Sequence, residues 1–296
     1  MTASPQPTVP PNALEFRQPP ASRTRPGGLD IGLVAGIAVA SLALAAGIAL
    51  TGVSAHYFFQ PTGMLIVVGG TLGVMLITTP PAALLHTLRR MLHLFSREAS
   101  PNRQDLTDEI VWYARTVRMK GMSAMEAGLD RVSHSFLREA LLLALDAKEH
   151  IELQSALENR IRLCERQSET AAKVLEVAGG FAPTIGVIGT VVGLIDVLRQ
   201  FSSMAAIASG VGAAFTSTIY GLALANLVLL PAAHRIRARA AETFELQELI
   251  MEGVLCVFDG MYSKLVRQRL DSFLTAAPFE ARSLSPVQTA PQTGQL

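Results

Sequence analysis

Four long blocks of apolar residues stand out from the mixed polar pattern of this chain. They occupy residues 31–53, 63–85, 177–198 and 205–231, and none carries a Lys or Arg near its centre. An α-helix needs about 20 mostly apolar residues to cross the hydrocarbon core of a bilayer. The pattern therefore predicts four transmembrane helices.

The segment between the second and third blocks has the three-to-four-residue periodicity of amphipathic helices. One predicted helix carries apolar residues at Leu106, Ile110, Ala114 and Val117, and a leucine-rich one covers 136–147. Both helices alternate apolar positions with charged ones. We expect them to form a helical body outside the membrane.

Two further helices are expected to extend beyond the membrane. An apolar stripe that begins at Leu153 meets no proline before Pro183, so one helix should run unbroken into the third block. Helical periodicity also continues after the fourth block. The sequence thus predicts an all-α integral membrane protein with four transmembrane helices and a helical cytoplasmic domain. The expected parts are a disordered tail at 1–28, two spans in 29–85, the cytoplasmic domain at 86–173, two spans in 174–233, a cytoplasmic C-terminal helix at 234–275 and a disordered tail at 276–296.

The distribution of arginine predicts how the chain is oriented in the membrane. Arginines precede the first block and follow the second and fourth, at Arg17, Arg23, Arg25, Arg89, Arg90, Arg97, Arg103, Arg235, Arg237 and Arg239. The turn at 54–60 has no Lys or Arg. Positive residues stay on the inside, so both termini and the 86–173 segment are expected to be cytoplasmic. The first block is longer than the apolar region of a signal peptide, which favours a retained helix.

Composition argues against several functional classes. Half of the residues are hydrophobic, 17% are charged and the net charge is +1, so no basic field favours nucleic-acid binding. Cys164 and Cys256 lack metal-site spacing and are expected to be reduced thiols. The glycine-rich stretch at 186–193 lacks the Lys of a phosphate-binding loop. We therefore expect no catalytic residues, metal or cofactor, and no enzyme activity.

Small residues within the apolar blocks indicate close helix packing. Gly69 with Gly73, and Gly189 with Gly193, have the small-xxx-small spacing that lets membrane helices approach closely. The contacts can lie within one subunit or between subunits, and the sequence leaves both readings open.

Three of these stretches together resemble the MotA/PomA family of flagellar stator subunits, a branch of the MotA/TolQ/ExbB proton-channel superfamily. They are MLIVVGGTL at 64–72, FAPTIGVIGTVVGLI at 181–195 and TSTIYGLALAN at 216–226. The resemblance implies a channel for Na⁺ or H⁺ in the bacterial inner membrane. It further implies five copies around a dimer of a MotB/PomB-type single-span partner, which together turn ion flow into torque on the rotor.

The distribution of charge agrees with the need for such a partner. No ionisable residue lies at the predicted mid-depth of any span, so the partner must supply the carboxylate that carries the cation. Asp196 falls near the outer end of the third span, where a packing role is favoured. The alternative function is an ExbB/TolQ-like energiser of outer-membrane transport. The resemblance implies that members of that branch have three spans and an outside N-terminus, whereas this chain is predicted to have four spans and an inside N-terminus.

The resemblance also assigns roles to six residues. Arg118 and Glu126 match the family's contact with the rotor's switch-complex protein, although such charges are otherwise ordinary solvated side chains. Pro183 and Pro231 match prolines that couple ion passage to motion; the alternative is that they begin and end ordinary spans. The last two residues are Thr190 and Thr218, which are expected to line the ion path.

The two threonines bear on the coupling ion. Threonines at Thr190 and Thr218 are associated in the family with sodium-driven members. Their hydroxyl oxygens offer lone pairs to a cation without adding charge. A threonine in a membrane helix can instead bond to the carbonyl one turn earlier. We expect sodium rather than proton coupling.

Overall fold

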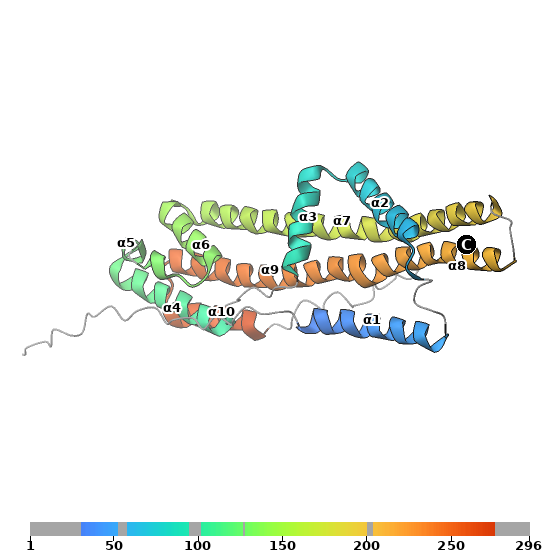
Figure 1. Ribbon diagram of the computed structural model, residues 1–296. Coiled ribbons are helices and arrows are strands. Elements are labelled where there is room, and N and C mark those ends of the chain that lie inside the picture. The colour runs from blue at the N-terminus through green and yellow to red at the C-terminus, as the bar shows by residue number, and fades with distance from the viewer. Residues whose placement is uncertain (1–30, 53–57, 95–101, 127, 200–203, 276–296) are drawn as a thin grey trace, which may run out of the picture. The chain divides into compact units, whose positions relative to one another are not determined.

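The computed structural model describes residues 31–52, 58–94, 102–126, 128–199 and 204–275, which are nearly all helical (Figure 1). This confirms the predicted helical class. Both predicted disordered tails lie outside the described residues. In chain order the elements are α1 (Ile31–Leu50), α2 (Pro61–Thr78), α3 (Pro81–His93), α4 (Arg103–Lys120), α5 (Ser123–Glu126), the 3₁₀ turn η2 (Leu129–Arg131), α6 (Ser135–Asp146), α7 (His150–Arg199), α8 (Met204–Ala223), the π-helix η3 (Leu224–Leu229), α9 (Leu230–Phe258) and α10 (Ser263–Thr275).

Three helical stretches among the described residues are long and apolar enough to cross a membrane. They are Pro61–Thr78, His150–Arg199 and Gly210–Phe258. The first predicted block also forms a helix, α1, within which Val34–Leu50 counts as a shorter apolar helix. The structure therefore gives three candidate spans where the sequence predicts four.

The second predicted block does not form one helix. It was expected to continue through residue 85, but α2 ends at Thr78 and Thr79 is extended. Pro80 disfavours a helical conformation of the residue before it, and Pro81 occupies the first helical position of α3, where its missing N–H costs nothing. The paired prolines thus divide the block into a span and a separate amphipathic helix.

The third and fourth blocks extend far beyond their apolar parts. α7 runs for 50 residues with Pro183 inside it, which confirms the unbroken helix. α8, η3 and α9 follow one another without a gap. The prediction of one helix over 234–275 is wrong. α9 ends at Phe258, and the chain then turns through Gly260, which adopts a φ of 64°. The amide of Met261 bonds the Cys256 carbonyl at 3.1 Å across this turn, and α10 begins after it.

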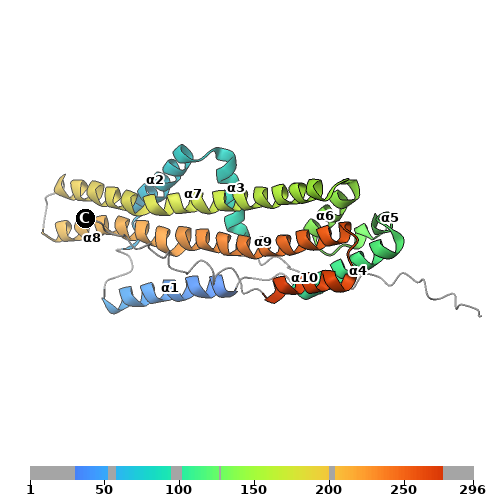
Figure 2. The same ribbon diagram turned by 180° about the vertical axis from the view of Figure 1, so that it is seen from behind.

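The described residues belong to two compact units. One holds α4, α5, α6 and α10 with the adjoining ends of α7 and α9, and its core includes the buried Ile110, Tyr113 and Leu270. The other holds α1, α2, α3 and α8 with the remaining parts of α7 and α9. In this second unit α7 lies beside α8 and α9 in both views (Figures 1 and 2). The contact of α7 with η3 and α9 is built largely from alanines, which keeps these helices close.

Candidate functional site

The contact between α7 and α8 within one subunit depends on glycines of both helices. A Cβ at Gly221 would lie 2.5 Å from the Ala182 carbonyl oxygen, and one at Gly186 would lie 2.9 Å from the Ser217 carbonyl oxygen. Only glycine permits this backbone approach. Gly189 and Gly193, whose contacts the sequence left open, also pack on α8 within the subunit, because a Cβ on either would lie 2.8 Å from a side chain of α8.

Gly69 and Gly73 on α2 differ from these glycines. A Cβ at either position would meet nothing within 4 Å. Gly70 between them contacts the Ile185 side chain instead. The small-xxx-small spacing on α2 is therefore not used in packing among the described residues.

Thr190 and Thr218 meet at the α7–α8 contact. Their hydroxyl oxygens are 2.5 Å apart, and the Thr190 hydroxyl also lies 3.2 Å from the carbonyl oxygens of Gly186 and Ala214. Thr190 is buried and Thr218 is half-buried. The structure thus brings together the two threonines that were expected to line the ion path. The bond from Thr190 to Gly186, one turn earlier, shows that the alternative structural role is also realised.

The two threonines place polar atoms inside an otherwise apolar contact. Each hydroxyl has one proton and two lone pairs, so the pair can bond to each other and still accept from a third group. Thr190 has two nearby carbonyl oxygens and can donate to only one acceptor at a time. The site can therefore change its hydrogen bonds without breaking a helix.

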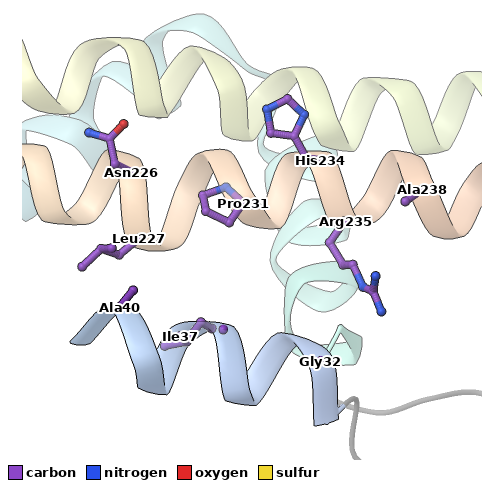
Figure 3. Close-up of a pocket in the computed structure, with 10 residues that line it drawn as sticks. Gly32, Ile37, Ala40, Asn226, Leu227, Pro231, His234, Arg235 and Ala238 are labelled. Carbon is purple, nitrogen blue, oxygen red and sulfur yellow. The ribbon is translucent and has the colours of Figure 1, made fainter. Parts of the chain in front are cut away.

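Pro183 and Pro231 lie in different backbone settings. Pro183 is inside the continuous α7, where it has no N–H to bond to Gly179. Pro231 follows the π-helix η3, a wider turn that often marks functional positions. It lines a hollow of about 490 Å³ that α1 borders on the other side, together with Asn226 and His234 (Figure 3).

Arg118, in the other unit, is held by the turn between α9 and α10. Its guanidinium lies 3.4 Å from the centre of the Tyr262 ring and donates to the Gly260 carbonyl oxygen at 2.7 Å. Glu126 ends the short helix α5 and is exposed. Both charges are therefore presented at the surface. The role of the turn was missed, because Gly260 and Tyr262 lie more than 140 positions further along the chain.

An ion-pair cluster in the second unit was also missed by the sequence analysis. Arg237 on α9 donates to both carboxylates of α7, with distances of 2.6 and 2.9 Å to Glu169 and 2.9 Å to the Oε2 of Glu176. These bonds hold the pKa of Glu169 below its ordinary value. The seven-residue spacing of the two glutamates is the only sequence signal, and it does not reveal the partner.

Glu109 forms a buried polar site in the first unit. Its carboxylate accepts the Ser133 N–H at 3.2 Å and the Ser133 hydroxyl. One turn along α4, the Tyr113 hydroxyl donates to the Gly128 carbonyl oxygen at 3.1 Å. Burial raises the pKa of Glu109, although the bonds from Ser133 oppose the rise. These contacts fix the segment that follows Glu126.

Comparison with known proteins decides which family these features belong to. Residues 126–248 match the MotA/TolQ/ExbB proton channel family, and residues 34–121 match the N-terminal region of motility protein A. The chain thus carries a MotA/TolQ/ExbB proton channel domain preceded by a motility protein A N-terminal domain. The matched ranges include all six predicted site residues: Arg118, Glu126, Pro183, Thr190, Thr218 and Pro231.

Individual relatives are similar to this chain over about four-fifths of its length. Motility protein A of Bacillus subtilis is 28% identical over 241 residues, which are 81% of this chain and 89% of that protein. Chemotaxis protein PomA of Vibrio alginolyticus is 28% identical over 244 residues, which are 82% of this chain and 93% of that protein. The flagellar MotAB stator complex from Bacillus subtilis matches the fold with a TM-score of 0.76 at 27% identity, covering 84% of this chain and 97% of that one.

The remaining titratable groups provide no metal site in the part of the chain that the structure describes. No cluster of three or more His, Cys, Asp or Glu residues is placed to hold a metal ion there. Cys164 and Cys256 are free thiols, and burial raises the pKa of Cys256. A raised pKa leaves Cys256 mostly protonated and unreactive.

Proposed function

We propose that this chain is the ion-channel subunit of a flagellar stator, which conducts Na⁺ or H⁺ with a MotB/PomB-type partner and turns ion flow into torque on the rotor. The observation that carries the proposal is the similarity to motility protein A and PomA over more than four-fifths of the chain. The additional match of residues 34–121 to the motility-specific N-terminal region favours a stator over an ExbB/TolQ-like energiser.

The proposed assembly has five copies of the chain around a dimer of the single-span partner in the inner membrane. A flagellar MotAB stator complex shares this fold at 27% identity, which supports a partner of that type. In this arrangement α1 is the first of four spans, and both termini are cytoplasmic. The arginines that flank the apolar blocks support this orientation.

The partner supplies the group that carries the cation. The predicted spans of this chain have no ionisable residue at mid-depth, so a carboxylate must come from elsewhere. Thr190 and Thr218 provide hydroxyl oxygens beside the path taken by the cation. Release of one charge through 100 mV yields roughly 2.3 kcal/mol, enough to bias a step between nearly equivalent positions of a ring.

Thr190 and Thr218 favour Na⁺ as the coupling ion. A partly dehydrated Na⁺ needs several oxygen ligands, whereas a proton can pass along water and a single carboxylate. The 2.5 Å contact between the two hydroxyls supports a shared site. Swimming speed should rise with external Na⁺ at fixed pH, and Thr190→Ala should weaken that dependence.

The control for this experiment is Thr216→Ala on α8. Thr216 is buried and its hydroxyl bonds the Gly212 carbonyl at 3.1 Å, so it tests the loss of a threonine back-bond. Rotation of the wild-type motor that does not depend on Na⁺ would refute sodium coupling. A proton-driven stator would then remain.

Arg118 and Glu126 are proposed to contact the rotor. Their exposure makes reversal of either charge cheap for folding, because exposed charges contribute little to stability. Arg118→Glu and Glu126→Arg should impair motility while membrane level and partner assembly stay unchanged. A lower protein level in both variants would support a folding role instead.

Complementation tests the whole proposal. The gene should restore motility to a stator-deficient strain when expressed with its single-span partner, and the two proteins should purify together in a ratio of about five to two, as the proposed assembly requires. Co-purification with a partner that carries a transport-coupling domain, and no motility, would support the energiser instead.

A further inference from the structure

The hollow beside Pro231 lies between two helical segments of the second unit. α1 forms one wall with Gly32, Gly36, Ile37 and Ala40, and η3 with the start of α9 forms the other. Its volume of about 490 Å³ falls within the range of roughly 300–1,000 Å³ that is usual for small-molecule sites. The hollow is therefore large enough for a ligand rather than for a single water molecule.

Small residues on one face of α1 leave this space open. Gly32, Gly36 and Ala40 are four positions apart, so they share one face of the helix. Such a face usually lets a membrane helix pack closely on its neighbour. Here, however, a Cβ added at Gly36 would meet nothing within 4 Å. The face therefore lacks the van der Waals partners that normally hold a helix against others in a membrane.

The two ends of the hollow differ in polarity. One end is lined by Leu227 of η3 together with Ile37 and Ala40, and Figure 3 shows these three side chains between the two helices. His234 and Arg235 line the other end, where Arg235 extends from α9 on the side that faces α1 (Figure 3). No Asp or Glu is among the described residues that line the hollow. An apolar space with a cation at one end fits an amphiphile with a negatively charged head.

The position of Arg235 in the chain places this cation at the membrane surface. Arg235 lies four positions after Pro231, where the fourth apolar block ends, and the arginines that follow the block mark the cytoplasmic side. Leu227 is eight positions earlier, which is about 12 Å deeper at 1.5 Å per helical residue. Basic pockets between membrane helices on the cytoplasmic side bind lipid headgroups. The hollow thus has the polarity and depth that a phospholipid requires.

We propose that this hollow binds one phospholipid molecule, with its phosphate at Arg235 and one acyl chain between α1 and η3. The guanidinium donates to the phosphate oxygens, and the acyl chain supplies the contacts that the small face of α1 lacks. The bound lipid lies against Pro231 and the π-helix. The proposal requires that α1 lies in a membrane, but not that the complex turns a rotor, so it can fail while the stator function stands.

Native mass spectrometry of the full chain with its partner, purified in detergent, tests the proposal by counting the phospholipids that stay bound. Gly36→Leu fills the hollow with a side chain, and no atom within 4 Å of the new Cβ opposes it. Gly47→Leu on the same helix is the matched control, because its Cβ also meets nothing within 4 Å and Gly47 does not line the hollow. Arg235→Gln removes the positive charge from the headgroup end.

We expect the wild type and Gly47→Leu to retain one more phospholipid per copy of the chain than Gly36→Leu. When phosphatidylglycerol is titrated into the delipidated complex, Arg235→Gln should bind it about five-fold more weakly, as the loss of one basic side chain near the headgroup predicts.

A photoreactive phospholipid with a diazirine on its acyl chain provides a second measurement before any detergent is added. Irradiation of vesicles that contain the complex should attach this lipid to the peptide that holds Leu227 in the wild type and in Gly47→Leu. Gly36→Leu should lose the adduct.

Two results would overturn the proposal. Equal lipid counts and equal adducts in Gly36→Leu and Gly47→Leu would show that the bound lipids lie elsewhere on the surface. Loss of assembly in Gly36→Leu, with normal assembly in Gly47→Leu and no lipid adduct at Leu227 in the wild type, would show that another protein chain fills the hollow.

Discussion

Arg118 is presented at the surface by a turn distant in sequence. The Tyr262 ring lies 3.4 Å from the guanidinium, and the Gly260 carbonyl accepts one of its N–H groups. A cation–π contact at an exposed site contributes about 0.5–1 kcal/mol. That is too little to determine whether the protein folds, but enough to restrict a long side chain to one direction.

The first prediction at the residue scale concerns Tyr262. Tyr262→Ala should reduce swimming, because it leaves Arg118 less fixed for its proposed rotor contact, while Tyr262→Phe should keep most of it. Ring expansion in soft agar is the measurement, with membrane level checked by immunoblot. Equal motility of the two variants would show that the ring does not position Arg118.

The second residue-scale prediction concerns the buried carboxylate of Glu109, whose pKa is raised in the folded state. A raised pKa means that the protonated acid favours folding at low pH, and this contribution is lost as pH rises through the folded pKa. The melting temperature of the wild type, relative to Glu109→Gln, should therefore rise as pH is lowered from 7 towards 5.

Thermal unfolding of the purified protein in detergent across this pH range provides the measurement for Glu109. Glu139→Gln, at a half-buried acidic residue of α6, is the control. A stability difference between wild type and Glu109→Gln that stays constant with pH would contradict the assigned shift.

Contacts of single residues divide into those that the sequence predicts and those that it does not. Thr190 and Thr218 could be singled out because each lies in a recognisable motif of an apolar block. Arg237 could not be paired with Glu169, nor Arg118 with Tyr262, because no local spacing links them. Such contacts depend on how distant helices pack.

At the scale of elements, the α7–α8 contact leads to a prediction about glycine. Gly221→Ala would place a Cβ 2.5 Å from the Ala182 carbonyl, a backbone atom that cannot move aside cheaply. Overpacking of this kind costs about 1–3 kcal/mol. We expect a lower melting temperature and loss of motility.

Gly212→Ala on the same helix is the control, since its Cβ would meet nothing within 4 Å. This variant should match the wild type in stability. Equal destabilisation by both substitutions would point to contacts made in the assembly rather than to the close backbone approach, because the higher helix propensity of Ala would by itself stabilise both variants.

The boundaries of the helices are the part of the fold that the hydrophobic pattern did not predict. Apolar length predicted α2, but hydropathy does not register the effect of Pro80 and Pro81 on the backbone, so the predicted span ran on into α3. Gly260 likewise interrupts an apolar period that otherwise continues from α9 into α10. In each case local backbone geometry overrides a hydrophobic pattern that is unchanged across the break.

At the scale of the whole molecule, the positions of the arginines predict the orientation in the membrane. In a background with Cys164→Ser and Cys256→Ser, Phe59→Cys should react with a membrane-impermeant thiol reagent on intact spheroplasts. Gln104→Cys should react only after permeabilisation, because arginines mark its segment as internal. Both positions are exposed, so burial does not confound the result. The opposite labelling pattern would invert the topology.

The helical class and the family were both recognisable from the sequence, because apolar blocks and glycine-rich motifs are local signals. The number of membrane spans is less clearly determined by such local signals. Among the described residues the structure gives three candidate spans, and Val34–Leu50 of α1 counts as a shorter apolar helix.

The π-helix η3 affects which side chains of the continuous α8–α9 helix face α7. Thr218 and Arg237, on either side of it, are 19 residues apart, and both contact α7. In an uninterrupted α-helix, 18 residues complete five turns, so a nineteenth would rotate Arg237 by about 100° away from α7. A π-turn absorbs one extra residue within its wider loop. That surplus residue keeps the membrane hydroxyl and the distant guanidinium directed at the same neighbouring helix.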